Sequence, residues 1–532
     1  MTDQAQPSIW ERSTLVRFFR WLFSWRVIRR TLIVLAWTAT IIALLYGEEN
    51  WRGRRAWNKY RHELEARGEQ LDWGAFIPKP VPDEQNFAAT PFIEFLFVNK
   101  TNSYNWNDGY GRASEKVSTS RTRSDRGNRH FIDLVAWRMA LDAIRSGGLV
   151  PREGFESDKL DLESRAKAAP AVLEELKTYD AIFAELRAAS LRPYSRCPIT
   201  YRLEDPWGIL LPHLSNIKNL IERLRLKACS ELAAGSHENA LADLMLMLRL
   251  TDSVKEEPFL ISYLVRIACL QIVSQPLWEG LAERRWSEAQ LQELQTRLQQ
   301  YNFVADLKWP LDAERASGIL TVDLLYRQKY RLSTLGEESG STRSEWTFGD
   351  LIGRIAPHGW YDQEQLNYCR LHQIQLGGTF DASEKRVWPG KIESNAHELE
   401  RELSGGRFGR RIGPIIHHRV VASLLLPALS KAIWRSAAAQ TAAEQAVLAC
   451  ALERYRLAIG QFPENLEALV PKFISRLPKD LITGEPYQYR RTDDGQFVLY
   501  SVGWNEKDDG GVIGKTLYDD KQGDWVWQYP PK

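Results

Sequence analysis

Between residues 131 and 330, hydrophobic residues recur at three- and four-residue spacing, which is the periodicity of helices with one buried face. Gly, Pro and Ser-x-x-Glu-like sequences interrupt the pattern and predict where helices end and begin. Short connections between consecutive helices favour stacked helical hairpins over a sheet sandwich, so we expect an α-helical domain here. The expected helices span 131–144, 160–189, 214–234, 238–254, 259–281 and 287–301.

A second pattern, an uninterrupted apolar run, covers residues 31–46. With Val27 and Ile28 included, and with Arg29 and Arg30 extending toward the lipid headgroups, the run approaches the roughly twenty residues that cross a bilayer. A cleaved signal peptide is the alternative, but no small-x-small cleavage site precedes the end of the run. We therefore expect one uncleaved transmembrane helix.

Charged residues beside this run predict its orientation. Six arginines lie in the basic tail, residues 1–30, and Glu48 and Glu49 follow the run directly, although further basic residues lie at 52–59. Because basic flanking residues are retained in the cytoplasm, we expect the tail in the cytoplasm and residues 47–532 outside it. This is the topology of a single-pass protein of the bacterial inner membrane whose bulk is periplasmic.

Two long segments have weaker periodicity. Residues 47–130 pass from a basic helical stretch to a Pro-rich passage and then to a polar run at 99–130, so we expect a juxtamembrane stalk followed by an exposed polar loop. Residues 331–417 are rich in Gly, Ser, Arg and Trp, and we expect an irregular segment with helices only at 362–374 and around 393–403. The Gly- and Arg-rich end of this segment predicts a flexible linker.

Residues 418–532 combine a helical pattern with a strand pattern. A long helix beginning near Arg419 ends at Gly460, and a short helix and a hairpin around Asp493–Gly495 follow it. Strands from this segment can cover the hydrophobic strip of the helix, so we expect a small α+β module. The strands are expected at 487–491 and 497–501, with Tyr487, Tyr489, Val498 and Tyr500 packing against Leu448, Leu452, Tyr455 and Ile459 of the helix.

The order of motifs in this module resembles the major pseudopilin of bacterial type II secretion and, more loosely, type IV pilins. Pseudopilins carry their hydrophobic helix behind a peptidase site at the N-terminus, and this chain does not, so the resemblance implies a borrowed module and not a polymerising subunit. The motifs are VVASLLLPAL, ALERYRLAIGQFPENLEALV, the turn Pro478–Gly484, Tyr487 and Tyr489, Leu499–Gly503, and Asp508–Gly511.

Together the patterns predict a mainly α fold with a transmembrane helix, a helical-hairpin domain and a small pilin-like α+β module. Residues 234–250 also resemble the turn and second helix of one tetratricopeptide repeat, with Gly235 at the turn and Ala240 at the helix contact. The expected parts are a basic tail at 1–30, a transmembrane helix at 31–46, a stalk and loop at 47–130, a helical domain at 131–330, an irregular segment at 331–417 and the α+β module at 418–532.

Composition adds two exclusions. The 532-residue chain is 44% hydrophobic and 26% charged, as in globular proteins, and its net charge of +2 gives no overall field that would attract nucleic acid. Its five cysteines are widely spaced without a Cys-x-x-Cys motif, which argues against a zinc site or a disulfide framework. We expect the cysteines to be small buried hydrophobic residues.

One acidic turn near the C-terminus has residues suited to a metal ion. Calcium prefers several hard oxygen ligands on a flexible loop, and the glycines at 510 and 511 let backbone carbonyls turn inward. The pseudopilin resemblance also implies a calcium ion in this loop. A solvated turn is the alternative. The candidate ligands are Asp508, Asp509, Asp519, Asp520 and Asp524.

The other motifs do not match a catalytic or phosphate-binding site. Asp509 stands where a phosphate-binding loop needs its first Gly, and His397-Glu398 lacks the second His of a zinc-protease helix. We therefore expect a non-catalytic scaffold that binds protein partners in the envelope, with no nucleic acid and no small-molecule substrate. The alternative is an envelope hydrolase with its site in the 331–417 segment. Its candidate residues, chosen by residue type alone, are His358, Asp362, His372 and Asp381.

Overall fold

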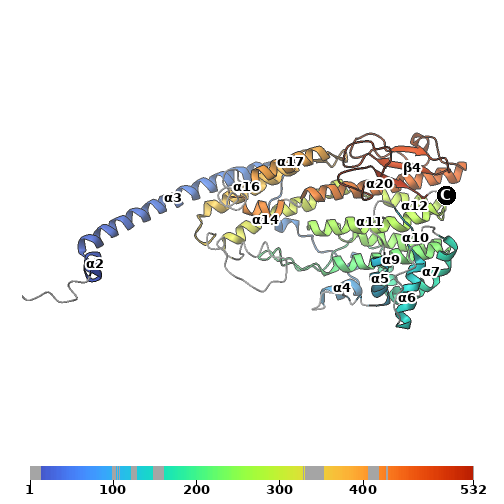
Figure 1. Ribbon diagram of the computed structural model, residues 1–532, viewed down its shortest axis with the longest axis horizontal. Helices are drawn as coiled ribbons and strands as arrows, with labels where there is room; N and C mark the ends of the chain where they lie inside the picture. Colours follow the sequence, from blue (N-terminus) through green and yellow to red (C-terminus); the bar gives the residue numbers. More distant parts are fainter. Residues whose placement is uncertain are drawn as a thin grey trace, which may run out of the picture.

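The computed structural model shows an elongated, mainly helical molecule, in which one long helix projects from the end of a larger body (Figure 1). The mainly α prediction is confirmed, and the described part of the chain contains two small antiparallel sheets. The C-terminal sheet lies at the end of the body far from the free end of the projecting helix. The structure describes residues 14–98, 104, 106, 108–120, 129–147, 161–327, 329, 353–404, 418–426 and 429–530.

The projecting helix is α3, Trp25–Ala66, preceded by the short helix α2, Thr14–Leu22. Its most apolar 18-residue window has a mean hydropathy of 1.7, and none of that window is buried in the protein. Among the described residues, the helical stretches long and apolar enough to cross a membrane are α3, α11 (Leu260–Ala282) and the helical residues between 420 and 459. In the last two, 61% and 50% of the apolar window is already buried inside the body. The expected apolar helix near the N-terminus is thus present, and it is the candidate without a protein partner over its apolar window.

The second half of α3 is part of the body. It packs along α16, His358–Leu376, and the two helices run in the same direction, since Asn50 bonds to Gly359 and Tyr60 bonds to Gln373. Trp57 of α3 is buried in this contact. A flexible joint therefore does not separate the apolar half of α3 from the body.

The described residues between 67 and 120 likewise lie against the body, in place of the expected separate stalk and exposed loop. Phe87, within the Pro-rich passage, is fully buried, and Trp73 and Phe76 of the 3-10 helix η1 (Trp73–Phe76) are buried beside α14. These aromatic side chains provide enough apolar surface to hold the Pro-rich backbone in place. The passage also contains η2, Asp83–Gln85, and α4, Pro91–Val98.

The polar run expected as a loop contains a helix, α5, Gly109–Ser120. Its Tyr110 stacks on Trp137 with ring centroids 5.0 Å apart, and the Arg223 guanidinium lies over the Tyr110 ring. Tertiary contacts thus outweigh the weak helix propensity of this Gly- and Ser-containing sequence. The rest of the polar run, 99–103, 105, 107 and 121–128, lies outside the described residues.

The helical region matches the periodicity closely. The turn between α9 and α10 is made at Gly235, whose φ of +82° suits Gly, and Ala240 is fully buried at the contact between the two helices. Consecutive helices α9, α10 and α11 pack on one another, which confirms the expected helical hairpins. The helices are α6 (Leu134–Ser146), α7 (Leu162–Leu176), η4 (Lys177–Tyr179), α8 (Asp180–Ala189), α9 (Pro212–Ala233), α10 (His237–Asp252), α11 (Leu260–Ala282), α12 (Glu288–Leu298), α13 (Phe303–Asp306) and α14 (Lys308–Tyr326).

The segment expected to be irregular contains two substantial helices where it is described. Helix α16 is followed by a two-stranded antiparallel sheet, β1 (Phe380–Asp381) and β2 (Arg386–Val387), and then by α17, Pro389–Leu403. Both helices include the stretches that the sequence predicted. The linker, apart from Ser404, lies outside the described residues.

The C-terminal part consists of α19 (Val420–Leu425), α20 (Leu429–Ile459), η8 (Leu466–Leu469) and a three-stranded antiparallel sheet. Strands β3 (Gln488–Arg491), β4 (Phe497–Ser501) and β5 (Trp525–Gln528) pair in sequence order. The two predicted strands are confirmed to within one residue. The sheet packs on α20, whose main helix neighbours are α12 and α11, and one hydrophobic core includes both Trp57 and Trp527.

The expected packing face of this sheet is wrong in part. Phe497 and Leu499 join the core against α20, whereas Val498 and Tyr500 lie on the opposite face in a small cluster with Val526. Successive strand residues point to opposite faces, so Val498 and Tyr500 cannot share a face with Leu499. On α20, Leu448 and Leu452 are buried in the core and Tyr455 packs against it, but Ile459 is 55% exposed at the end of the helix.

Candidate functional site

Three side chains with metal-binding or catalytic chemistry meet near the start of α9. His213 is the second residue of that helix, Cys197 lies in the segment between α8 and α9, and Glu257 lies between α10 and α11. A sulfur, an imidazole nitrogen and a carboxylate oxygen of these residues all lie within 4.8 Å of one another. His213 is fully buried, Glu257 is buried, and Cys197 is half-buried. We call these three residues the Cys–His–Glu cluster.

Hydrogen bonds and stacking fix the orientation of the cluster. Nε2 of His213 lies 2.7 Å from Oε1 of Glu257, and the Ser262 hydroxyl donates to the other carboxylate oxygen over 2.5 Å. The ring of Phe97, from α4, stacks on the imidazole with centroids 5.2 Å apart. Nδ1 of His213 is buried and has no hydrogen-bond partner among the described residues.

The burial and mutual contacts of the cluster change its protonation. Burial opposes a charge on the imidazole, but Cys197 and Glu257 outweigh it and raise the pKa of His213 to about 10. Burial raises the pKa of the Cys197 thiol above its ordinary value, against the opposing effect of His213.

This arrangement differs from a nucleophilic triad. In a Cys–His–carboxylate triad, one imidazole nitrogen faces the nucleophile and the other faces the carboxylate. Here the nitrogen that faces Glu257 is Nε2, and Nδ1 faces no partner among the described residues. The raised pKa of Cys197 also opposes formation of a thiolate nucleophile. The geometry instead offers three donor atoms, one each of sulfur, nitrogen and oxygen, within 4.8 Å of one another.

The acidic turn predicted as a calcium site is only partly assembled. Carboxylate oxygens of Asp524 accept hydrogen bonds from the backbone N–H groups of Asp509 and Gly511, and Oδ1 of Asp508 accepts from Tyr500 and from Gly510. Burial raises the pKa of Asp524, and the nearby carboxylates of Asp508 and Asp509 raise it further. A bound cation would offset the mutual repulsion of these three carboxylates.

The other two predicted ligands have different surroundings. Oδ1 of Asp519 accepts hydrogen bonds from the N–H groups of Lys521 and Gln522, so this carboxylate caps its own turn. Asp520 is exposed. The calcium site stays a prediction that centres on Asp508, Asp509 and Asp524.

The candidate hydrolase residues do not gather at one place. His358 and Asp362 form a contact of 2.9 Å at the start of α16, but His372 lies fourteen residues further along the same helix, which corresponds to about 21 Å of helix rise. His372 is buried, and Asp381 accepts hydrogen bonds from Ser383 and Glu384 in its own turn. A His–carboxylate pair is thus present without a neighbouring nucleophile from this set.

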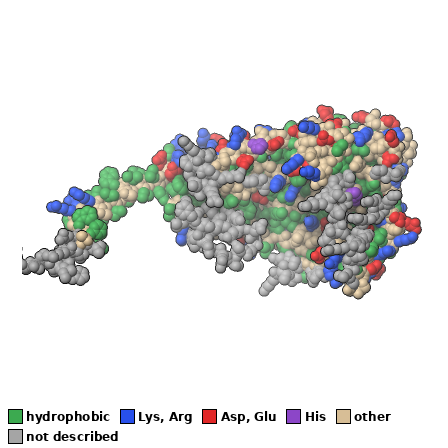
Figure 2. Space-filling view, viewed as in Figure 1, with side chains coloured by type: hydrophobic (Ala, Val, Ile, Leu, Met, Phe, Trp, Pro, Cys, Tyr) green, Lys and Arg blue, Asp and Glu red, His purple; other side chains and the backbone are tan. Residues whose placement is uncertain are grey.

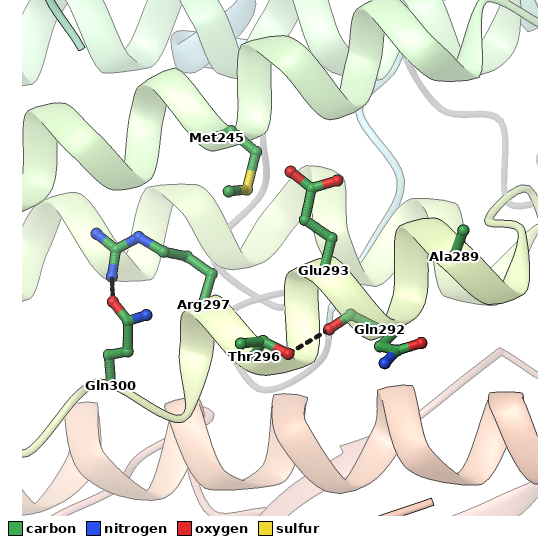
Figure 3. Close-up of a pocket in the computed structure, with 7 residues that line it drawn as sticks. All are labelled: Met245, Ala289, Gln292, Glu293, Thr296, Arg297 and Gln300. Atoms are coloured by element: carbon green, nitrogen blue, oxygen red, sulfur yellow. Dashed lines mark hydrogen bonds between the residues drawn. The ribbon is translucent and has the colours of Figure 1, made fainter. Parts of the chain in front are cut away.

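An open surface groove of about 390 Å³ runs along α12, with Met245 of α10 facing it (Figure 3). Its polar groups include Glu293 and the Arg297 guanidinium, which is already paired with Asp252. No nucleophile–base pair is found among the residues that line it. They are Met245, Ala289, Gln292, Glu293, Thr296, Arg297 and Gln300.

Sequence reasoning missed the Cys–His–Glu cluster. His213 and Glu257 are 44 residues apart, and Cys197 lies in a different connection, so no short motif links them. Four cysteines are buried as expected, and Cys197 is the exception. The site has to be interpreted from its own geometry, because comparison with protein-family models, with curated proteins and with solved structures found no match for this chain.

Proposed function

We propose that this protein is a membrane-anchored scaffold of the bacterial envelope, with its N-terminal tail in the cytoplasm and its body on the outer side of the inner membrane. The observation that carries the proposal is the two-part character of α3. Its first half exposes hydrophobic side chains over its surface, with basic residues at the free end, whereas the body carries charges of both signs (Figure 2). A helix of this kind is stable in water only where lipid or protein covers it.

The shape of the body supports a binding role. It presents long helices side by side, and its C-terminal end carries an antiparallel sheet packed on α20, an arrangement compatible with the pilin-like module that the sequence resembles. Stacked helical hairpins and such small α+β modules offer extended surfaces for protein partners. The candidate hydrolase residues are spread along α16 and the following turn, which favours a scaffold over the hydrolase.

The topology can be tested with two reporters fused after Lys532 and expressed in a bacterial host. Alkaline phosphatase is active only outside the cytoplasm, and green fluorescent protein is fluorescent mainly inside it. We expect phosphatase activity without fluorescence, and retention in the membrane after alkaline extraction. The reverse reporter pattern, or release of the intact chain by alkali, would contradict the anchored, outward-facing arrangement.

The scaffold role needs a separate test. The full-length protein, solubilised in mild detergent, should co-purify with an envelope protein in a fixed ratio. A His358→Ala/Asp362→Asn double variant should retain this partner, since the proposed role does not use that pair. Purified protein that stays free of partners but hydrolyses envelope substrates, and loses that activity in the double variant, would favour the hydrolase.

A further inference from the structure

We propose that Cys197, His213 and Glu257 form a binding site for a divalent transition-metal ion, with Zn²⁺ the best match to the three donors. Thiolate, imidazole and carboxylate are the ligands that zinc uses in proteins. Calcium and magnesium prefer oxygen ligands throughout, so the sulfur and nitrogen donors disfavour them. This site is separate from the acidic turn at the C-terminus and from the proposed anchoring role.

The distances require only small movements. Zinc–ligand bonds of about 2.0 to 2.3 Å in tetrahedral geometry place the donor atoms about 3.5 Å from one another. The three donors already lie within 4.8 Å of one another, and Nε2 of His213 is 2.7 Å from Oε1 of Glu257. Entry of the ion would replace this hydrogen bond with two metal bonds, with release of the imidazolium and thiol protons.

The supporting residues hold the donors as a metal site requires. Ser262 donates to the oxygen of Glu257 that does not face His213, and the Phe97 ring stacks on the imidazole. The imidazole of His213 and the carboxylate of Glu257 therefore keep a fixed orientation. His213 lies in the first turn of α9, and Glu257 lies in the short connection between α10 and α11, which pack within the core. Such pre-organisation lowers the cost of assembling the site around an ion.

A purely structural role explains the cluster less well. The thiol, imidazole and carboxyl groups form a compact set of titratable groups that a nonpolar packing could replace at lower cost. A bound cation would compensate the negative charge of the thiolate and the carboxylate together.

The half-buried position of Cys197 suggests how an ion enters and what completes its coordination. The side of the cluster at Cys197 has access to solvent, whereas His213 is fully enclosed. Three protein ligands leave one tetrahedral position for a water molecule or an exogenous ligand. The site therefore has the ligand count of an open zinc site, in contrast to the four protein ligands of a closed structural one.

The test uses the full-length protein in detergent, stripped with a chelator and titrated with Co²⁺ as a spectroscopic substitute for Zn²⁺. We expect one equivalent of Co²⁺ to produce the visible bands of tetrahedral cobalt and a near-ultraviolet thiolate-to-cobalt band, both abolished by one equivalent of Zn²⁺. Absence of the thiolate band from the wild-type titration would overturn the proposal without any variant.

Variants then identify the ligands. Cys197→Ser should remove the thiolate band, and Ser262→Ala, which leaves all three ligands in place, should weaken Zn²⁺ binding about tenfold. The matched control is Cys369→Ser, because Cys369 is a buried cysteine of α16 outside the cluster, and it should bind Zn²⁺ as the wild type does. An unchanged Co²⁺ spectrum in Cys197→Ser would place the metal elsewhere and overturn the assignment. If Cys197→Ser does not fold, the wild-type spectrum and the Ser262→Ala affinity decide.

Discussion

Gly53 of α3 and Gly359 of α16 are in direct backbone contact. A Cβ atom built on Gly53 would lie 2.2 Å from the carbonyl oxygen of Gly359, and one built on Gly359 would lie 1.9 Å from the carbonyl oxygen of Glu49. Neither neighbour is a flexible side chain that could move aside. The two helices can therefore lie this close only because both positions are glycine, and Asn50 bonds to the Gly359 N–H at the same point.

This contact predicts opposite effects for two glycine substitutions on α3. Gly53→Ala should destabilise the body by about 1–3 kcal/mol, because the added methyl group forces the helices apart. Gly47→Ala is the matched control on the same helix, since its Cβ would meet nothing within 4 Å, and it should be neutral or stabilising by about 0.5–1 kcal/mol. Thermal unfolding of both variants in detergent measures the difference. Equal melting temperatures would mean that α3 and α16 are not packed as described.

A second prediction concerns the attachment of the C-terminal sheet to α20. The Tyr487 hydroxyl donates a hydrogen bond of 2.8 Å to the buried carboxylate of Glu444. Tyr487→Phe keeps the ring but removes the donor, so the free energy of unfolding should fall by about 1–3 kcal/mol. Tyr194→Phe, at a tyrosine that is 41% exposed, should change it little. Denaturant unfolding followed by tryptophan fluorescence suits the measurement, and an unchanged midpoint for Tyr487→Phe would contradict the coupling.

A third prediction uses the buried imidazole of His372. Burial and the nearby Arg315 guanidinium lower its pKa to about 3, against an ordinary value near 6.5. Between these values the unfolded chain binds a proton that the folded chain does not, so this contribution to stability is present above pH 6.5 and is lost as the pH falls toward 3. At pH 5 the loss amounts to roughly 2 kcal/mol.

The pH dependence can be assigned with two variants. His372→Gln should flatten the decrease in melting temperature between pH 7 and pH 5, because glutamine takes up no proton. His397→Gln is the control, since His397 lies on the exposed side of α17 with 70% of its side chain accessible. A variant profile with the same slope as that of the wild type would show that His372 is not the titrating group.

The acidic turn gives a fourth prediction. Calcium should release or absorb heat in a calorimetric titration of the full-length protein and should raise its melting temperature, because it would bind the folded turn. Asp508→Asn removes one carboxylate charge but keeps an oxygen acceptor for Tyr500 and Gly510, and it should weaken the effect. Asp493→Asn, in the exposed β3–β4 turn, should leave the effect intact. A wild-type protein with neither heat nor a rise in melting temperature would exclude the calcium site.

Local sequence patterns were sufficient to predict an element whose own residues determine its structure. The helices of the 131–330 region follow from apolar residues at three- and four-residue spacing, and the β3–β4 hairpin follows from the turn residues Asp493–Gly495 between two segments with strand patterns. The position of the apolar half of α3 was predictable for the same reason. In each case neighbours in the sequence determine the structure.

Local sequence patterns failed where contacts between residues far apart in the sequence determine the structure. Helix α5 has a Gly- and Ser-containing sequence, and it is held by Trp137 and Arg223 from other helices. The Pro-rich passage is fixed by the burial of Phe87. The Cys–His–Glu cluster draws on two connections and the first turn of α9, which only the folded chain brings together, so no spacing rule could have found it. Alternation along β4 shows which residues share a face, but it does not show which of the two faces packs on α20.

Helix α3 is one unbroken rod of 42 residues, about 63 Å long, and its inner end is fixed beside α16. With its apolar half in a bilayer, the helix would have no hinge between the lipid and the body. Any tilt or axial rotation of α3 in the lipid would therefore rotate the whole body through the same angle. Bilayer thickness, which alters such tilt, would then set how high and in which direction the far sheet is carried above the membrane surface.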